Sequence, residues 1–211
     1  MGRRRLGRNN RQEASRRPNE TLLEITIIKK RGNSQMKTIR VAAAQFAIGT
    51  DLDANLKTVL RMIDKAAENK PDLLVLPEFC NHLSWYDDND HCHNVSVKPD
   101  SAFVQTVAAK AKEHKLYIVL NVTTQQADSL TAATSLLLSP AGEILASSDK
   151  QVLIGHENDF LQRATSVCPI IETPLGRLGM YACMDGVINE TPRDLALRGA
   201  QVLCNSLNSF A

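Results

Sequence analysis

Three side chains of complementary chemistry, Glu78, Lys150 and Cys183, each stand at the end of a run of residues that is typical of a β-strand. A carboxylate can take up and return protons, an ammonium group can stabilise developing negative charge, and a thiolate can attack a carbonyl or nitrile carbon. The crevice of an α/β sheet opens at the carboxyl ends of its strands, so these side chains can meet there. Each has a plain structural interpretation if taken alone, but their combination predicts an acyl-transfer site.

Cys183 is the predicted nucleophile because Met184, Asp185 and Gly186 follow it in a turn that precedes a predicted helix. Backbone N–H groups at such a position lower the pKa of a thiol and can bind an oxyanion. We therefore predict a lowered pKa for this thiol. Three other cysteines are interpreted as small buried apolar residues, which is the usual state of a free cysteine. This interpretation applies to Cys80, Cys168 and Cys204.

The segments that must position these side chains alternate between strand and helix in the first half of the chain. Apolar residues recur at helical spacing in two segments, and short apolar runs mark three strands. The predicted strands cover residues 39–46, 73–76 and 116–122, and the predicted helices cover residues 54–68, with Asp53 as N-cap, and 101–114. This alternation is typical of an α/β domain.

Two antiparallel hairpins are predicted in the second half of the chain. Each consists of two apolar runs joined by a turn that contains proline and glycine. The hairpins cover residues 131–148 and 169–182, and a helix near residues 191–198 and a strand at 201–204 follow them. We therefore expect mixed sheets rather than a purely parallel one.

Five segments of the chain resemble, in the same order, sequence motifs of the carbon-nitrogen hydrolases, also called the nitrilase superfamily. They cover residues 41–46, 74–79, 149–153, 173–185 and 193–205. The resemblance implies an α/β fold in which two mixed sheets with outer helices form an α-β-β-α sandwich. It also implies no metal, no cofactor, and a homodimer or higher homo-oligomer for full-length members.

The resemblance further implies a role for each candidate catalytic residue. Glu78 corresponds to the general base, Lys150 to the group that stabilises the tetrahedral intermediate, and Cys183 to the nucleophile that forms a thioester. Glu157 corresponds to an auxiliary glutamate that orients the lysine, and the backbone N–H of Met184 to an oxyanion donor. The implied reaction is hydrolysis of a non-peptide carbon-nitrogen bond in a small amide, nitrile or carbamoyl compound, with amides placed first.

The segment between residues 80 and 93 is rich in cysteine and histidine, which are ligands of zinc. Its spacing matches no standard zinc module, and in an extended segment only His91 and His93 share a side, so we predict no metal site. By the resemblance this segment helps to shape the substrate pocket, which makes Trp85 and Tyr86 candidate specificity residues. A surface loop with no part in the site is the alternative.

Charge divides the chain into two parts. Residues 1–37 hold 11 of the 25 Lys and Arg residues and 3 of the 23 acidic residues, so they carry +8 and residues 38–211 carry −6. We predict that residues 1–37 are a basic, flexible extension, in which residues 21–28 can form a short strand. Residues 38–211 are the predicted hydrolase domain, and the resemblance implies that it is incomplete at its C-terminus.

Two classes of function therefore remain: an active hydrolase, and a truncated, non-catalytic remnant that oligomerises. The acidic domain argues against nucleic-acid binding, and no run of about 18 apolar residues is present to cross a membrane. The five cysteines are odd in number and form no CxxC pair, which favours a reducing compartment and predicts a cytoplasmic location.

Overall fold

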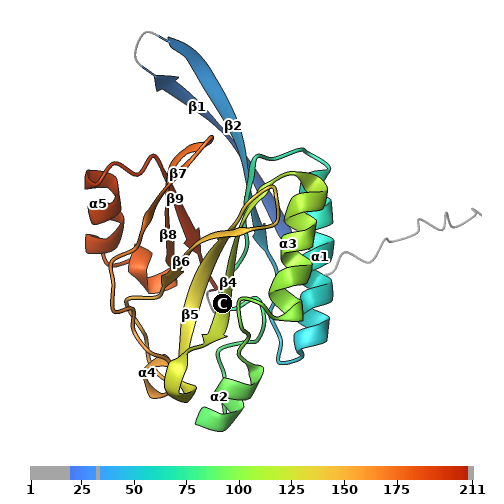
Figure 1. Ribbon diagram of the computed structural model, residues 1–211, viewed down its shortest axis with the longest axis vertical. Coiled ribbons are helices and arrows are strands. Elements are labelled where there is room, and N and C mark those ends of the chain that lie inside the picture. The colour runs from blue at the N-terminus through green and yellow to red at the C-terminus, as the bar shows by residue number, and fades with distance from the viewer. Residues whose placement is uncertain (1–19, 32–33, 209–211) are drawn as a thin grey trace, which may run out of the picture.

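The computed structural model describes residues 20–31 and 34–208 and shows two β-sheets that face each other, with helices on their outer sides (Figure 1). The larger sheet consists, in spatial order, of β1 (Thr21–Arg31), β2 (Ser34–Gln45), β3 (Leu73–Val75), β4 (Tyr117–Gln125), β5 (Thr131–Leu138) and β6 (Ile144–Asp149). The smaller sheet consists of β7 (Ile170–Thr173), β8 (Gly176–Ala182) and β9 (Val202–Ser206).

Each sheet contains both parallel and antiparallel pairs. In the larger sheet β2, β3 and β4 run parallel to one another, whereas β1 is antiparallel to β2, and β5 is antiparallel to both β4 and β6. In the smaller sheet β8 runs antiparallel to β7 and parallel to β9. Together with the outer helices, this arrangement confirms the predicted α-β-β-α sandwich of two mixed sheets.

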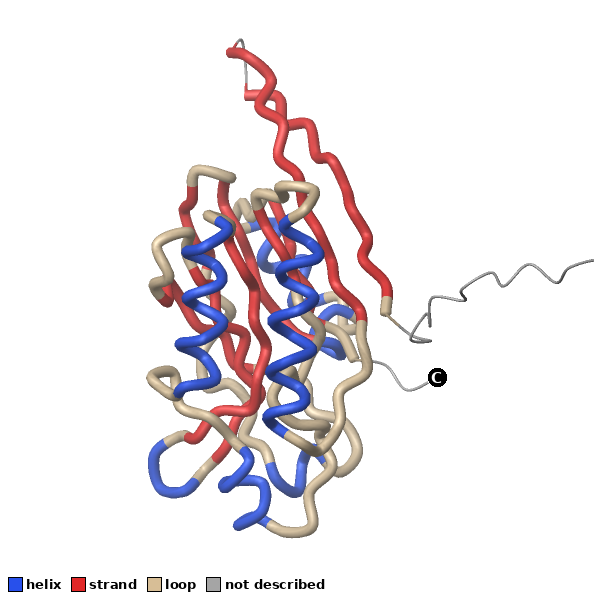
Figure 2. The backbone as a smooth tube through the Cα atoms, turned by 90° about the vertical axis from the view of Figure 1, so that its right-hand side faces the viewer, coloured by secondary structure: helices blue, strands red, loops and turns tan. Residues whose placement is uncertain are grey.

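Two helices, α1 (Leu52–Ala67) and α3 (Ala102–His114), lie side by side on the outer face of the larger sheet (Figure 2). α1 begins after Asp51, whose Oδ1 accepts a hydrogen bond from the backbone N–H of Ala54 at 3.0 Å, and not after the predicted Asp53. Apolar residues recur on the face of α1 that packs against the sheet, as helical periodicity requires. The fully buried ones are Val59, Met62, Ile63 and Ala66.

A second apolar core fills the space between the two sheets. It joins Leu73, Val119 and Leu137 of the larger sheet to Leu178 and Met180 of β8. The alternation of side chains along a strand sends Tyr181 of β8 to the opposite face, where it packs with Leu195 of α5 (Glu190–Leu197). β3 and β8 are thus packed on both faces.

Part of the predicted N-terminal extension belongs to the larger sheet. β1 pairs with β2 along its whole length, from Thr21 opposite Gln45 to Arg31 opposite Ser34. The two strands extend well beyond the rest of the molecule (Figures 1 and 2). Glu20 anchors the base of this hairpin, because the Nη atoms of Arg61 on α1 donate to its carboxylate at 2.5 and 2.7 Å. The rest of the predicted extension, residues 1–19, lies outside the described residues.

Four short helices connect the main elements: α2 (Asn89–Val95), η1 (Ala127–Ser129), α4 (Glu157–Phe160) and η2 (Cys183–Gly186). The expectation of an extended segment through residues 80–93 is wrong in its last part. Asp88 caps α2 there by accepting a hydrogen bond from the backbone N–H of His91 at 2.7 Å. Among the described residues, no helix has the length and apolar character needed to cross a membrane.

Candidate active site

The three predicted catalytic residues follow strands that end at one edge of the sandwich. Lys150 comes directly after β6 and Cys183 directly after β8, while Glu78 follows β3 by three residues. β3 and β6 belong to the larger sheet and run in the same direction, since two antiparallel pairings separate β6 from β4. The strand ends therefore bring together side chains that lie far apart in the sequence.

Lys150 is the centre of a buried ionic cluster. Its Nζ donates to Oε1 of Glu78 at 2.7 Å and to Oε1 and Oε2 of Glu157 at 2.9 and 2.8 Å. The ammonium group also lies 5.4 Å from the ring centroid of Phe79. Lys150 is 0% exposed and the two glutamates are 1% and 3% exposed, so this cluster is shielded from solvent. The structure thus places the predicted auxiliary Glu157 in contact with the lysine.

Cys183 faces the same cluster and is 8% exposed, more than the three charged residues. The carboxylate of Glu78 and the ammonium group of Lys150 both act on its thiol. The pKa of Cys183 is raised to about 11, first by burial and then by the negative charge of Glu78, while the positive charge of Lys150 acts to lower it. The predicted lowering of this pKa is therefore wrong, because burial and the adjacent carboxylate disfavour the thiolate more than Lys150 favours it.

The pKa of Glu78 is also raised. Burial raises the pKa of Glu78 to about 7, although the charge of Lys150 and its hydrogen bond act to lower it. For Lys150, burial alone would lower the pKa, but the two carboxylates around the ammonium group raise it above its ordinary value. A carboxylate that titrates near neutrality beside a neutral thiol and a permanently charged amine is suited to accept the thiol proton.

The turn that carries Glu78 is fixed by a buried asparagine on β4. The next residue, Phe79, adopts φ +62°, and its backbone N–H donates to Oδ1 of Asn121 at 2.9 Å. The backbone N–H of Cys80 donates to the carbonyl of Asn121 at 2.8 Å, and the Asn121 amide donates to Ser135 Oγ at 3.0 Å. Sequence analysis did not identify Asn121, although an amide inside an apolar strand is a signal for such a role.

Cys183 lies at a sharp turn between β8 and η2. Its φ of +46° is in the left-handed region that residues with a side chain rarely adopt. Gly186 allows the turn to pass close to its neighbours, because a Cβ there would lie 2.6 Å from Nδ2 of Asn205 and 2.8 Å from Cε2 of Tyr181. Met184 is the second residue of η2, where backbone N–H groups have no partner within the helix itself.

The two candidate pocket residues differ in their surroundings. Tyr86 is 6% exposed and packs in a cluster with Phe79, with its ring centroid 5.5 Å from that of Phe160. Trp85 is 65% exposed and lies against the ring of His156, at 5.4 Å between centroids. Tyr86 is therefore buried in the cluster that contains Phe79, whereas Trp85 is on the surface beside the segment that leads to Glu157.

The cysteine and histidine residues of the segment from 80 to 93 do not form a cluster with metal-site geometry. Within residues 20–31 and 34–208, the group of three metal-type side chains that does lie together is Asp64, Glu113 and His114, between α1 and α3. There Nζ of Lys110 lies 2.8 Å from Asp64 and 3.0 Å from Glu113. The lysine supplies the positive charge that a bound cation would provide, so this group forms an ion-pair network between the helices.

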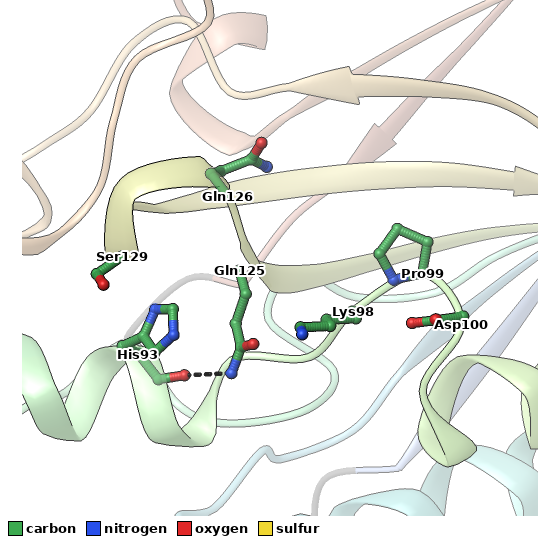
Figure 3. A pocket seen from close by; sticks show the side chains of 7 residues that line it. All are labelled: His93, Lys98, Pro99, Asp100, Gln125, Gln126 and Ser129. Atoms are coloured by element: carbon green, nitrogen blue, oxygen red, sulfur yellow. Dashed lines mark hydrogen bonds between the residues drawn. The ribbon is translucent and has the colours of Figure 1, made fainter.

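A cavity of about 490 Å³ is lined by residues other than the candidate catalytic ones (Figure 3). His93, Lys98 and Gln125 contribute to its lining, and the Gln125 amide donates to the backbone carbonyl of His93 at 2.9 Å. Two smaller cavities have volumes of about 200 and 150 Å³. None of these three is lined by Glu78, Lys150 or Cys183.

Comparison with known proteins gives relatives that share this combination of fold and sequence. The chain is 26% identical over 175 residues to the nitrilase and fragile histidine triad fusion protein NitFhit of Caenorhabditis elegans, covering 77% of this chain and 39% of the relative. It is 26% identical over 171 residues to the deaminated glutathione amidase of Escherichia coli, covering 77% and 63%. The chain thus spans between about two fifths and two thirds of the length of these relatives.

A solved structure, an amidase from Nesterenkonia sp., has the same fold. It superposes with a TM-score of 0.71 at 23% sequence identity, covering 80% of this chain and 64% of the other. The family model described as carbon-nitrogen hydrolase matches residues 40–210, which is most of the chain. With the predicted motifs, the sandwich and the cluster around Lys150 in agreement, the chain belongs to the carbon-nitrogen hydrolase family.

Proposed function

We propose that this protein hydrolyses the carbon-nitrogen bond of small amides through a thioester on Cys183, with Glu78 as general base and Lys150 as electrostatic stabiliser. The observation that carries the proposal is the convergence of three strand ends on one buried cluster. Nζ of Lys150 is 2.7 Å from Oε1 of Glu78, and both of these groups act electrostatically on the thiol of Cys183. Such a cluster has the nucleophile, the base and the cation that acyl transfer requires.

In the first half-reaction Glu78 takes the thiol proton as the sulfur of Cys183 attacks the amide carbonyl carbon. Negative charge then develops on the carbonyl oxygen, where the ammonium group of Lys150 and the backbone N–H of Met184 stabilise it. Glu78 passes its proton to the leaving nitrogen as the carbon-nitrogen bond breaks. Ammonia or an amine departs, and the acyl group remains on sulfur as a thioester.

In the second half-reaction water replaces the nitrogen leaving group. Glu78 takes a proton from the water as its oxygen attacks the thioester carbon, and the same oxyanion contacts stabilise the second tetrahedral intermediate. The carbon-sulfur bond breaks, Glu78 returns the proton to the sulfur, and a carboxylic acid is released. Glu157 remains bound to Nζ of Lys150 and holds the ammonium group in position throughout.

The relatives support an amide as the substrate. One is named a deaminated glutathione amidase, and another solved Nesterenkonia structure is described as showing Michael addition of acrylamide at the active site cysteine. The Cys183 thiol corresponds in our proposal to that cysteine. Nitriles and carbamoyl compounds are the runner-up substrates, since a thiolate also adds to their electrophilic carbon. Trp85 and Tyr86 are the proposed specificity residues, and no metal or cofactor takes part in the proposed steps.

Apolar side chains exposed around α5 support association with another copy of the chain. Leu197 of α5 is 72% exposed and Val187, which precedes it, is 65% exposed. We propose a homodimer or higher homo-oligomer, to be measured by light scattering coupled to size exclusion. The same exposed residues favour the second candidate function, an oligomerising chain without catalytic activity. The five cysteines are free, and we propose a reducing, cytoplasmic location on that ground.

Substrate turnover and a covalent adduct test the proposed function. A panel of small primary amides and nitriles is incubated with the protein, and released ammonia and intact mass are measured. We expect ammonia release from at least one amide, together with an acyl adduct on Cys183. Cys183→Ala must abolish both, whereas Cys204→Ala, at a buried cysteine in β9, serves as the matched control and retains them. Slow, unselective reaction of all five thiols and no turnover would support the non-catalytic alternative.

A further inference from the structure

Asp185, two residues after the nucleophile, is a buried carboxylate with no part in the steps proposed above. It is 0% exposed. Its Oδ1 accepts hydrogen bonds from the backbone N–H groups of Gln151 and Val152 at 3.0 and 2.8 Å. Its Oδ2 lies 3.3 Å from the backbone N–H of Ala182, which donates to it. All three hydrogen bonds are to backbone groups rather than to other side chains.

These backbone donors adjoin the two reactive residues. Gln151 and Val152 come directly after Lys150, and Ala182 comes directly before Cys183. The first pair follows β6 of the larger sheet, whereas Ala182 is the last residue of β8 in the smaller sheet. A single carboxylate therefore connects the lysine segment to the cysteine turn, across the boundary between the sheets.

From this geometry we infer that Asp185 is a positioning residue, which holds the backbone after Lys150 in register with the turn that carries Cys183. The inference rests on the function proposed above and adds a residue that acts through the backbone. The backbone of Lys150 itself is bonded to Ala133 at 2.8 Å and to Ala164 at 2.9 Å, and neither partner belongs to the smaller sheet. Those hydrogen bonds hold the backbone of Lys150 relative to Ala133 and Ala164. The carboxylate of Asp185 holds the residues after Lys150 relative to the turn that carries Cys183.

A carboxylate is the side chain that suits this position. Both of its oxygens are acceptors, and the three donors use both. An asparagine can accept at one oxygen, but its amide nitrogen would face a second N–H donor. Burial raises the pKa of Asp185, and the N–H groups of Val152, Ala182 and Gln151 each act to lower it. Three hydrogen bonds thus offset the free-energy cost of burying this carboxylate.

A small displacement of the turn that Asp185 holds would also displace the reacting atoms. Cys183 has φ +46°, a conformation that persists only when the surrounding structure holds it. The charged groups that face its thiol are Glu78, Lys150 and Glu157. If the turn relaxes, the sulfur moves away from the base and the cation together. A displacement of about 1 Å in such a site costs on the order of 100-fold in rate.

The test is the pH dependence of Cys183 alkylation by iodoacetamide, followed by peptide mass, in the wild-type protein, Asp185→Ala and Asp185→Asn. In the wild type we expect the alkylation rate to rise as Glu78 loses its proton, at its pKa of about 7. In Asp185→Ala this neutral rise disappears, because the sulfur no longer lies next to Glu78, and the rate rises only at alkaline pH, where the thiol itself ionises. The rate at neutral pH falls at least about tenfold, and Asp185→Asn is intermediate because it keeps one acceptor.

Thr173→Ala is the matched control, because Thr173 also binds backbone groups of the β7–β8 hairpin, at the end opposite to Cys183. Its hydroxyl donates to the carbonyl of Gly176 at 2.7 Å and accepts from the N–H of Leu175 at 3.1 Å. This variant is expected to lose thermal stability and to keep the wild-type pH profile. A purely structural role for Asp185 predicts the same behaviour in its own variants.

The outcomes separate the two proposals. If the wild type shows the neutral rise and the folded Asp185 variants keep it, the positioning role is wrong while the proposed function stands. If the wild type shows no selective reaction at Cys183 and no amide turnover, the proposed function fails and the positioning role fails with it. Should Asp185→Ala not fold, Asp185→Asn, which has nearly the same volume, decides the question by the same profile.

Discussion

At the scale of single residues, burial controls the protonation of the candidate site. It raises the pKa of Glu78 to about 7 and that of Cys183 to about 11, so the resting pair is a thiol beside a carboxyl group that titrates near neutrality. A direct thiolate would require the helix-end effect that the sequence suggested, but η2 has four residues and Glu78 opposes it. In the proposed reaction, activation of the sulfur therefore depends on transfer of its proton to Glu78.

The first prediction concerns the stability of the protein against pH. Because the pKa of Glu78 is raised from its ordinary 4.5 to about 7, the folded protein binds this proton more tightly than the unfolded chain. The resulting stability is fully present below about pH 4.5 and is lost as pH rises through about 7. Glu78→Gln removes this dependence, which amounts to about 3 kcal/mol at most.

Urea denaturation of both proteins in mildly acidic and mildly alkaline buffer measures this effect. The free energy of unfolding of Glu78→Gln relative to wild type should rise from the acidic to the alkaline buffer, because the wild type loses stability over this range. Alkylation of Cys183 should at the same time lose its neutral rise in this variant, because the proposed base has been replaced. Equal slopes of stability against pH in the two proteins would contradict the raised pKa.

The second prediction concerns the buried cation. Lys150→Met leaves the carboxylates of Glu78 and Glu157 next to each other without a counter-charge, and breaking such a pair costs about 3–5 kcal/mol of unfolding free energy at neutral pH. Adding Glu157→Gln to this variant should recover part of the loss, since one charge is then removed. Chemical denaturation checks both statements.

Lys110→Met is the matched control for this prediction. Lys110 also lies between two carboxylates, but Asp64 and Glu113 are 47% and 56% exposed at their side chains. Solvent screens these ion pairs, so the loss should stay within about 1 kcal/mol. Similar losses of unfolding free energy for the two lysine variants would contradict the prediction that burial of the carboxylates makes the loss of Lys150 more costly.

At the scale of elements, apolar periodicity was sufficient for most of the helices and strands. The sequence predicted the helix of α1 and the hairpin of β5 and β6, because their patterns are local. It did not predict α2, since the helix depends on the Asp88 cap within a polar segment. It did not identify Asn121 or Asp185, each of which accepts hydrogen bonds from backbone groups of a segment more than 30 residues away.

The third prediction concerns the turn between β8 and η2. In Gly186→Ala the new Cβ would lie 2.6 Å from Nδ2 of Asn205 and 2.8 Å from the ring of Tyr181, so these groups must shift. Overpacking of this kind costs about 1–3 kcal/mol. We expect a lower melting temperature and slower alkylation of Cys183, because the displaced turn carries the nucleophile.

Gly49→Ala provides the comparison. Its Cβ would meet only Oδ1 of Asn55, at the ordinary contact distance of 3.7 Å, and it lies outside the site. This variant should match the wild type in Cys183 alkylation. If the two alanine variants alkylate at equal rates, the close approach at Gly186 does not position the nucleophile.

At the scale of the whole molecule, β1 completes the edge of the larger sheet. The family model begins at residue 40, inside β2, so β1 lies outside the matched region. The pattern of residues 21–28 suggested a short strand, but its partner could not be predicted because an edge pairing depends on which neighbour is open. The structure shows β1 pairing with β2 and Glu20 bound to Arg61 of α1.

The fourth prediction follows from this edge. Deleting residues 1–31 removes β1 and leaves the N–H and C=O groups of β2 unpaired along the edge, which favours association between chains. We expect larger particles by light scattering and earlier aggregation on heating. Deletion of residues 1–18, which leaves β1 and Glu20 in place, is the control and should scatter like the full chain. Equal scattering of the two deletions would mean that β1 does not protect the sheet.

The left-handed backbone of Cys183 also makes this position suitable for a substrate trap. Glycine adopts φ +46° without a steric penalty, so Cys183→Gly should melt at a higher temperature than Cys183→Ala while lacking the sulfur that reacts. Uncleaved amides would then remain bound next to Glu78 and Lys150. Incubating this variant with a mixture of candidate compounds and identifying the retained compound by mass spectrometry would show which substrate it binds.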